Sequence, residues 1–358
     1  MSLYVHIPFC RQICAYCDFA KVFYNQKWAD AYLIQLEKEL NDRDANHLHE
    51  TVYIGGGSPS SLSLDQLRVL FSILKEPLQG CKEATIEVNP EDLTLEKAKL
   101  FKESGITRVS LGVQTFNDEH LKVIGRHHNL AMIKQALNDL VEAGIERISI
   151  DFIYGLPHQT FEDLKEDLAI LKTLDMVSHV SFYTLILEEN TKFYFDGVTL
   201  KDDEWLIDAQ AILIDGLKAL GFERYEVSNF AKPNEQSMHN LVYWHHEPYI
   251  GIGCGASGYI GVVRYDNTKS ITKYLKGTTT ASKTILSKED EMFEVLMLGL
   301  RLTKGISIPD FISRFNVHPF EVFDLERFME MGLLEIEEGY LKTTSKGMDV
   351  LDEILIDM

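Results

Sequence analysis

The first 225 residues alternate between two hydrophobic patterns, and this alternation limits the fold more than any other feature of the chain. Short runs rich in Val, Ile and Tyr are typical of buried strands, and the longer segments between them, with apolar residues three or four apart, are typical of helices. The predicted strands are 4–9, 51–54, 84–88, 108–113, 147–153 and 179–187. The predicted helices are 28–40, 64–74, 95–105, 133–144, 161–174 and 204–221. Alternation at this spacing means parallel strands with crossover helices, so the sequence predicts an α/β fold of six βα units.

The alternation does not choose between a curled, TIM-like barrel and an open doubly wound sheet. In both architectures, functional residues gather at the C-terminal ends of the strands. The unusual residues of this chain follow or end the predicted strands in turn: Cys10, Cys14 and Cys17, then Gly55–Gly56–Gly57–Ser58, then Glu87, Gln114 and Asp151. We therefore expect these side chains to meet at one mouth of the fold.

Cys10, Cys14 and Cys17 form a C-x3-C-x2-C run, and only two other cysteines occur in the chain. Zinc would need a fourth ligand, such as His6 or Asp18, because structural zinc sites are tetrahedral. A redox thiol pair would not need a third cysteine, and buried structural cysteines would not need this spacing in a polar loop. Short cysteine runs are typical of iron–sulfur clusters, and three thiolates on a [4Fe-4S] cluster leave one iron open to another ligand. The run therefore favours a [4Fe-4S] cluster, with zinc as the alternative.

A C-x3-C-x2-C loop after the first strand, followed by a GGG loop after the second, resembles the radical S-adenosylmethionine (SAM) enzymes. The resemblance implies that SAM chelates the open iron. The glycines would let backbone groups approach the amino acid part of SAM closely. Glu87 and Asp151 would be satisfied by a ribose diol or an ammonium group, and Arg126 could pair with the SAM carboxylate.

Longer motifs resemble one branch of that superfamily, the oxygen-independent coproporphyrinogen III oxidase group. They are YVHIPFC at 4–10, YCDF at 16–19, GGGSPS at 55–60, TIEVNPE at 85–91, SLGVQTF at 110–116 and IDFIYGLPHQT at 150–160. The resemblance implies a radical-SAM partial (β/α)6 TIM-like barrel. It also implies SAM contacts by Tyr4, Tyr16, Gly56, Gly57, Ser58, Glu87, Gln114, Arg126 and Asp151, with Tyr16 beside the cluster.

Two departures separate the chain from the oxidases of that group. The oxidases carry a further cysteine where this chain has Phe19, and they have a long N-terminal extension where only nine residues precede Cys10. In both respects the chain resembles the HemW-type haem chaperones. The resemblance therefore implies haem binding and delivery of the haem to an acceptor protein. Radical decarboxylation of coproporphyrinogen III to protoporphyrinogen IX stays as the alternative, and whether the chain is an enzyme stays open.

The segment HNLVYW, from His239 to Trp244, resembles the HNxxYW motif of the haem chaperones. An imidazole can ligate haem iron, and aromatic rings can stack on a porphyrin. The resemblance therefore implies haem contacts by His239, Tyr243 and Trp244, with His245 and His246 as spare ligands. The alternative is a packed loop whose histidines are satisfied within the protein.

The last part of the chain is expected to form a separate unit. Helical patterns at 286–305, 306–316 and 320–332, a hairpin at 333–347 and a final helix predict a winged-helix-like α+β domain. The hairpin is acidic (EIEE), which argues against DNA binding and for a lid or docking role. We expect a core at 1–225, a connector with the HNxxYW segment at 226–285, and the C-terminal domain at 286–358.

The net charge of −20 argues against binding to nucleic acid or to an anionic membrane. The sequence shows no transmembrane run and no signal peptide, and its odd number of cysteines favours a reducing compartment, so we expect a cytoplasmic protein. The expected partners are haem or a porphyrinogen, an acceptor protein that the sequence does not name, and a reductant such as a flavodoxin or ferredoxin.

Overall fold

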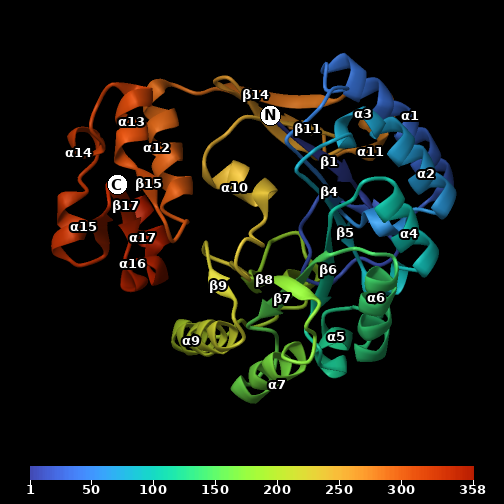
Figure 1. The fold of residues 1–358 in the computed structure, drawn as a ribbon, viewed down its shortest axis with the longest axis horizontal. Helices are drawn as coiled ribbons and strands as arrows, with labels where there is room; N and C mark the ends of the chain where they lie inside the picture. The colour runs from blue at the N-terminus through green and yellow to red at the C-terminus, as the bar shows by residue number, and fades with distance from the viewer.

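One twelve-stranded sheet organises most of the protein, whose computed structural model describes residues 1–358 (Figure 1). Its strand order is β14-β13-β12-β11-β1-β4-β5-β6-β7-β8-β10-β9, and its two end strands do not pair with each other. The predicted strands are all present and mutually parallel: β1 (Ser2–Ile7), β4 (Thr51–Gly56), β5 (Glu83–Val88), β6 (Arg108–Gln114), β7 (Arg147–Tyr154) and β8 (Val177–Thr184). The predicted α/β fold of six βα units is therefore confirmed, as a curved sheet that does not close.

The crossover helices also lie where the apolar spacing predicts them. They are α1 (Gln26–Asp42), α2 (Leu64–Ile73), α4 (Leu95–Glu103), α6 (Leu130–Glu142), α7 (Phe161–Leu171) and α9 (Asp203–Ala219), with short helices α3 (Lys75–Leu78), α5 (Asp118–Val123) and α8 (Lys192–Phe195) between them. A polar side chain caps the start of each crossover helix; Asn129, for example, accepts a hydrogen bond from the backbone N–H of Met132 at the start of α6. Gly144 follows α6 with a φ of 81°, which a glycine adopts without strain.

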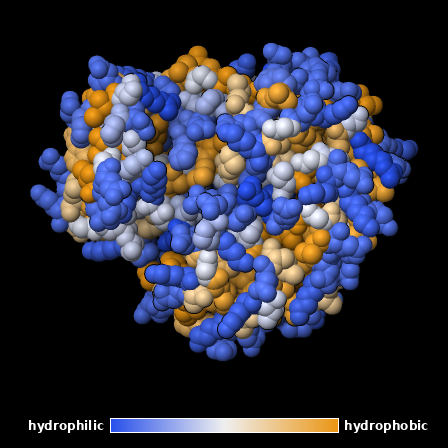
Figure 2. All heavy atoms as spheres, viewed as in Figure 1, coloured by the Kyte–Doolittle hydropathy of each residue, from blue (hydrophilic) through white to orange (hydrophobic).

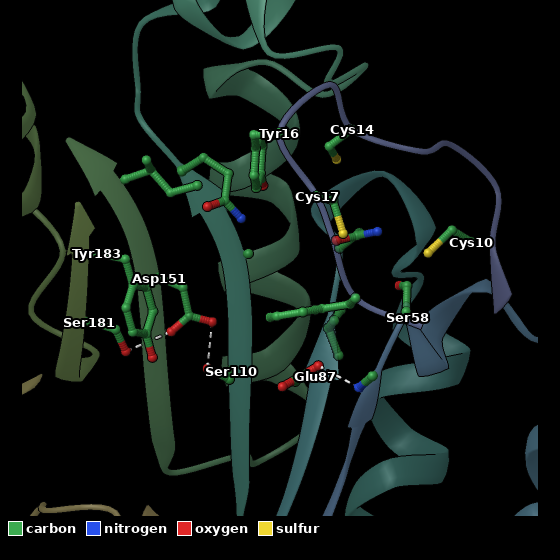
Figure 3. A pocket seen from close by; sticks show the side chains of 18 of the residues that line it. Cys10, Cys14, Tyr16, Cys17, Ser58, Glu87, Ser110, Asp151, Ser181 and Tyr183 are labelled. Atoms are coloured by element: carbon green, nitrogen blue, oxygen red, sulfur yellow. Dashed lines mark hydrogen bonds between the residues drawn. The ribbon is translucent and has the colours of Figure 1, made fainter. Parts of the chain in front are cut away.

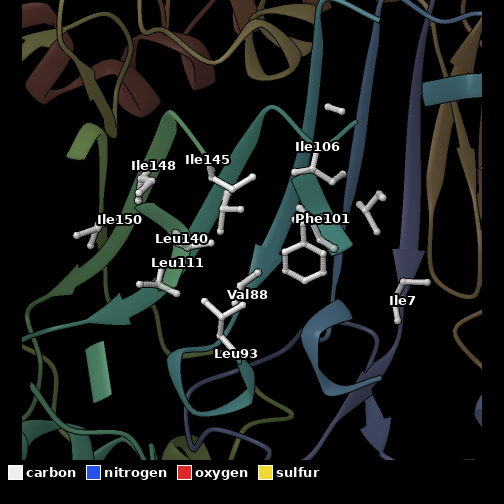
Figure 4. Packing of buried hydrophobic residues seen from close by; sticks show 14 of the residues in the cluster. Ile7, Val88, Leu93, Phe101, Ile106, Leu111, Leu140, Ile145, Ile148 and Ile150 are labelled. Atoms are coloured by element: carbon white, nitrogen blue, oxygen red, sulfur yellow. The ribbon is translucent and has the colours of Figure 1, made fainter. Parts of the chain in front are cut away.

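The strands divide the interior into an apolar shell and a polar lumen. On β6, Val109, Leu111 and Val113 are buried in the main hydrophobic core between the sheet and its helices (Figure 4). The alternate residues of the same strand, such as Ser110 and Gln114, face the other side and line a cavity. Side chains alternate across a strand, so each of these strands buries its apolar residues under the helices and turns its polar residues toward the interior of the curved sheet. This arrangement indicates a binding site in that interior.

The connector adds strands to the main sheet, which the sequence analysis did not predict. β9 (Glu223–Arg224) lies just before the connector, which contains β10 (Asn229–Ala231), α10 (Met238–Trp244), β11 (Tyr249–Ile252), β12 (Ser257–Ile260), β13 (Val263–Asn267), α11 (Ile271–Tyr274) and β14 (Thr280–Ile285). β11 pairs in parallel with β1, with Ser2 opposite Tyr249. These strands are short and their partners are far away in sequence, so local patterns do not identify them. The domain limits that we expected remain predictions.

The C-terminal part has its own hydrophobic core around Leu296, Phe311 and Leu341. It contains α12 (Lys288–Gly299), β15 (Ile306–Ser307), α13 (Ile308–Phe315), α14 (Pro319–Val322), α15 (Glu326–Glu330), β16 (Leu334–Glu337), β17 (Tyr340–Thr343), α16 (Ser345–Asp349) and α17 (Leu351–Ile356). The predicted hairpin is β16–β17, and a third strand, β15, completes its sheet. The predicted helix 320–332 is two short helices, and the final helix is likewise divided.

Polar contacts join this C-terminal part to the connector. Glu294 on α12 accepts hydrogen bonds from Arg264 (2.6 Å to Nη2) and from Nε2 of His246 (2.7 Å). The face seen in Figure 2 is mostly hydrophilic, with smaller hydrophobic areas between. No helix combines the length and the hydropathy needed to span a membrane.

Candidate functional site

A cavity of about 360 Å³ opens at the C-terminal ends of the parallel strands (Figure 3). Its lining includes all three cysteines of the C-x3-C-x2-C run and eight of the nine residues that the resemblance implies in SAM binding. Those eight are Tyr16, Gly56, Gly57, Ser58, Glu87, Gln114, Arg126 and Asp151. Residues from six different loops and strands, far apart in sequence, therefore meet in one place.

Cys10 ends β2 (Phe9–Cys10), and Cys14 and Cys17 lie on the loop between β2 and β3 (Val22–Phe23), here called the cluster loop. Cys10 is buried, whereas Cys14 and Cys17 are half-buried. Burial, together with the nearby Cys17 and Cys14, raises the pKa of Cys10 to about 12, so the three thiols interact electrostatically. No group of three His, Cys, Asp or Glu side chains in the structure is placed to hold a metal ion.

Backbone contacts hold the cluster loop against the barrel. The N–H of Ala15 donates to the carbonyl of Ile124, and the carbonyl of Ala15 accepts from the N–H of Phe193. Nε2 of His6 donates to the carbonyl of Ala20 (2.8 Å), which leaves Nδ1 to accept from the hydroxyl of Tyr4 (2.9 Å). The sequence analysis considered His6 only as a zinc ligand, but here it anchors the end of the loop.

The glycines after β4 form a cradle that larger residues would fill. A Cβ at Gly57 would lie 2.9 Å from Sγ of Cys10, and one at Gly55 would lie 2.8 Å from the carboxyl group of Glu87. Gly56 has a φ of 119°, which side chains rarely tolerate. The space beside Cys10 therefore depends on the absence of side chains.

Two buried carboxyl groups face this cavity from neighbouring parts of the sheet. Glu87 accepts hydrogen bonds from the hydroxyl of Tyr53 (2.8 Å) and the N–H of Gly56 (3.0 Å). Asp151 accepts from the hydroxyls of Ser110 and Ser181, both at 2.8 Å. Burial raises the pKa of Glu87 to about 7, and burial likewise raises the pKa of Asp151 above its ordinary value. Neither carboxyl group has a cationic partner, so both can receive hydrogen bonds from a ligand.

Tyr53, Ser110 and Ser181 hold these two acids, and the sequence analysis missed all three. The available signal was the polar residue at every second position of otherwise apolar strands. His179, on the neighbouring strand, bonds to Ser149 (2.6 Å) and continues the polar lining deeper into the lumen.

Arg126 and Gln114 complete the cavity wall. Nη1 of Arg126 donates to Oδ1 of Asn89 (2.6 Å), whereas its buried Nε has no partner. Burial opposes ionisation of Arg126, but Cys14, Tyr16 and Glu91 outweigh it and raise the pKa. Gln114 sits at a shift in the β6–β7 register with a φ of 69°, a strained conformation of the kind found at functional sites. The free Nε of Arg126 suits a carboxylate.

Tyr4, the ninth residue, lies in a neighbouring cavity of about 720 Å³, which shares Asp18, Phe19, Gly56 and Glu87 with the first. Tyr243 of the HNLVYW segment also lines this second cavity. Tyr4 therefore shares this second cavity with two of the predicted SAM contacts, Gly56 and Glu87, but does not line the first.

The predicted haem residues lie on α10, and His239 is fully buried there. Thr51 donates its only hydroxyl hydrogen to Ser2 (2.8 Å), so Nδ1–H of His239 donates to Thr51 (2.7 Å). Nε2 then accepts from the hydroxyl of Tyr243 (2.8 Å). Both nitrogens are thus engaged within the protein, and burial lowers the pKa of His239 to about 3.

Trp244, the last residue of the motif, and the two histidines that follow it lie in different environments. The indole N–H of Trp244 is buried without a partner. Of the two spare histidines, His246 is buried and bonds to both Glu294 and Arg314, whereas His245 is exposed. Cys254, which lies among glycines, is buried.

Family models match two parts of the chain: the Radical SAM superfamily model covers residues 4–171 and the HemN C-terminal domain model covers residues 286–350. A protein named haem chaperone HemW from Lactococcus lactis is 39% identical over 373 residues, with 99% of this chain and 97% of the relative covered. Its namesake in Bacillus subtilis is 36% identical over 370 residues at the same coverage, and that of Escherichia coli is 34% identical over 368 residues, again covering 99% and 97%.

A solved structure shares nearly the whole fold. It is coproporphyrinogen III oxidase (HemN) from Escherichia coli, described as a radical SAM enzyme, with a TM-score of 0.87 and 24% identity. The match covers 99% of this chain and 89% of that one. At this identity, the likeness shows the common fold and not a common reaction.

Proposed function

The chain belongs to the HemW family within the radical SAM superfamily, and from this premise we propose that it holds a [4Fe-4S] cluster with SAM, binds haem and delivers the haem to an acceptor protein. The observation that carries the SAM part is the convergence of three thiols and eight polar or glycine residues on one cavity. The haem part rests on the relatives' name and on the HNLVYW segment.

In this proposal, Cys10, Cys14 and Cys17 would hold the cluster and leave one iron for SAM. Bound cluster and SAM supply one-electron reductive cleavage of the SAM sulfonium. The protein binds and orients: the cradle at Gly56 and Gly57 accepts the amino acid part of SAM, and Arg126 pairs with its carboxylate through the free Nε.

The two buried acids would bind the polar groups of SAM. Glu87 and Asp151 each keep lone pairs for the ammonium or the ribose hydroxyls, because their present partners are neutral donors. Gln114 can donate and accept at the same wall, and the ring of Tyr16 stands beside the cysteines. Tyr4 would act through His6, which holds the cluster loop.

For haem, we propose α10 as the binding element, with Tyr243 and Trp244 as aromatic contacts. Direct ligation of the iron by His239 would require two buried hydrogen bonds to break, because both of its nitrogens are occupied. Delivery to an acceptor, and an electron donor such as a flavodoxin or ferredoxin, belong to the same proposal.

The test is anaerobic reconstitution with iron and sulfide, followed by haem titration and a porphyrinogen decarboxylation assay with SAM and reductant in the same sample. We expect about four irons and four sulfides per chain, stoichiometric haem binding and no decarboxylation. Turnover without tight haem binding would instead identify a coproporphyrinogen oxidase.

A further inference from the structure

Gln114, the last residue of β6, turns a free amide group toward the first cavity. The residue lines that cavity, is 6% exposed, and makes no side-chain hydrogen bond within the protein. A Cβ at Gly112 would lie 3.0 Å from Nε2 of Gln114 and 3.0 Å from Nη2 of Arg126, so the two side chains approach the same glycine. The amide of Gln114 is therefore placed to bind a ligand beside Arg126.

The backbone of Gln114 pays for this placement with strain. Its φ of 69° lies in the left-handed region, which residues with a side chain adopt at a cost in free energy. The register between β6 and β7 shifts between Gly112 and Gln114, and Gln114 pairs with Phe152 after the shift. Pairing with β7 fixes the chain on the N-terminal side, so the conformation persists only if the chain is also held on the C-terminal side.

Asp167, on α7, holds the two residues that follow Gln114. Its Oδ1 accepts from the N–H of Phe116 (2.8 Å), and its Oδ2 accepts from the hydroxyl of Thr115 (2.9 Å). The hydroxyl of Thr115 also lies 3.2 Å from Oδ1. Every hydrogen bond that this carboxylate accepts therefore comes from the segment directly after Gln114.

The contact is an expensive one for the protein to make. Asp167 is 2% exposed, and no cationic side chain forms an ion pair with it. Burying a carboxylate without a cation costs free energy that only hydrogen bonds can offset. A hydrogen bond to an ionised carboxylate is stronger than one to a neutral acceptor. The carboxylate thus supplies a stronger hold on residues 115–116 than a neutral side chain would.

We propose that Asp167 is a positioning residue for SAM binding, which keeps Gln114 in its left-handed conformation and so presents the amide of Gln114 to SAM. Asp167 lines neither cavity, so it acts through Gln114 and does not touch the ligand. This inference rests on the proposed function, in which Gln114 contacts SAM. It gives a role to a buried acid that the proposed function leaves unused.

The test is a set of double-mutant cycles, with the Kd of SAM measured at pH 8 on the reconstituted full-length protein. Asp167→Asn removes the charge at constant size, and Thr115→Val removes the hydroxyl but keeps the carboxylate. We expect each to weaken SAM binding about three- to tenfold, the effect of about one hydrogen bond. The iron and sulfide content should stay at the wild-type value. In a Gln114→Ala background, neither change should weaken SAM binding further.

The matched control is Asp215→Asn, because Asp215 is exposed on α9 and lines neither cavity. It should bind SAM as the wild type does. Urea unfolding checks that each variant is folded, and if Asp167→Asn does not fold, Thr115→Val still tests the link because its carboxylate keeps the bond to Phe116.

The Gln114→Ala background separates positioning from general stability. Equal losses of SAM affinity with and without Gln114 would overturn the proposal, because Asp167 would then only stabilise the fold. Wild-type affinity in Thr115→Val and Asp167→Asn would overturn it as well. Gln114→Ala that binds SAM like the wild type would refute the contact on which the proposal depends. A reconstituted wild type that binds no SAM would instead refute the proposed function itself.

Discussion

The hydroxyl of Tyr243 and Nε2 of His239 are 2.8 Å apart, with the imidazole completely buried between Tyr243 and Thr51. A histidine in this position contributes to the folded interior whether or not a ligand is bound. Its contribution to stability can therefore be measured without haem.

We predict that His239→Ala lowers the free energy of unfolding by about 1–3 kcal/mol, because it removes the buried hydrogen bond to Thr51 and leaves the hydroxyl of Tyr243 without its acceptor. Urea unfolding of the apoprotein measures this change. His245→Ala is the control, since His245 is exposed, and should change the stability by less than about 0.5 kcal/mol. Equal stability of the two variants would contradict the hydrogen-bonded arrangement.

The same histidine makes stability depend on pH. Burial lowers the pKa of His239 to about 3, so the unfolded chain takes up its proton at a higher pH than the folded chain does. This contribution is complete above the unfolded pKa of about 6.5 and is lost as the pH falls from there toward 3. The wild type should lose up to about 1.4 kcal/mol per pH unit more than His239→Gln does over this window. Identical slopes in urea unfolding at pH 6.5 and pH 4.5 would show that the group is not buried neutral.

For the cluster, Cys14→Ala should remove the iron and sulfide that anaerobic reconstitution adds to the wild type. The loss is expected because two thiolates cannot hold the cluster on this loop. Cys81→Ala is the matched control, because Cys81 lies outside both cavities and should leave the metal content unchanged. A full iron and sulfide complement in Cys14→Ala would refute the assignment of the ligands.

SAM binding should strengthen with pH around neutrality. Burial raises the pKa of Glu87 to about 7, so its carboxyl group is largely protonated at pH 6 and largely ionised at pH 8. The ionised form accepts hydrogen bonds from ribose hydroxyls or an ammonium group more strongly. SAM titrations of the reconstituted wild type should therefore give a lower Kd at pH 8, whereas Glu87→Gln should bind weakly with little change over this range. A pH response retained in Glu87→Gln would assign it to another group.

Arg126→Lys should weaken SAM binding about tenfold or more, because lysine offers a single ammonium in place of the fork that includes the free Nε. The iron and sulfide content should stay at the wild-type value, which separates a SAM contact from a cluster defect. Arg68→Lys, an exposed arginine on α2, provides the control. Unchanged SAM affinity in Arg126→Lys would place the SAM carboxylate elsewhere.

The sequence by itself determined the elements that depend on local pattern. Apolar spacing located six strands and their helices, and Asn129 and Gly144 mark the ends of α6 because capping is decided by neighbouring residues. The sequence also predicted one shared cavity, because parallel strands bring their C-terminal ends together. The three cysteines, Glu87 and Asp151 all lie at or after such ends, and all of them line that cavity.

Only the tertiary structure decided which distant groups became partners. No local pattern predicts that β11 pairs with β1, because paired residues such as Ser2 and Tyr249 are far apart in the sequence. The motif HNLVYW has the same sequence whether His239 faces solvent or the interior. A buried imidazole is stable only where both nitrogens find partners. Tyr243 follows His239 by one turn on α10, but the other partner, Thr51, comes from β4, and only the tertiary structure brings it to the histidine.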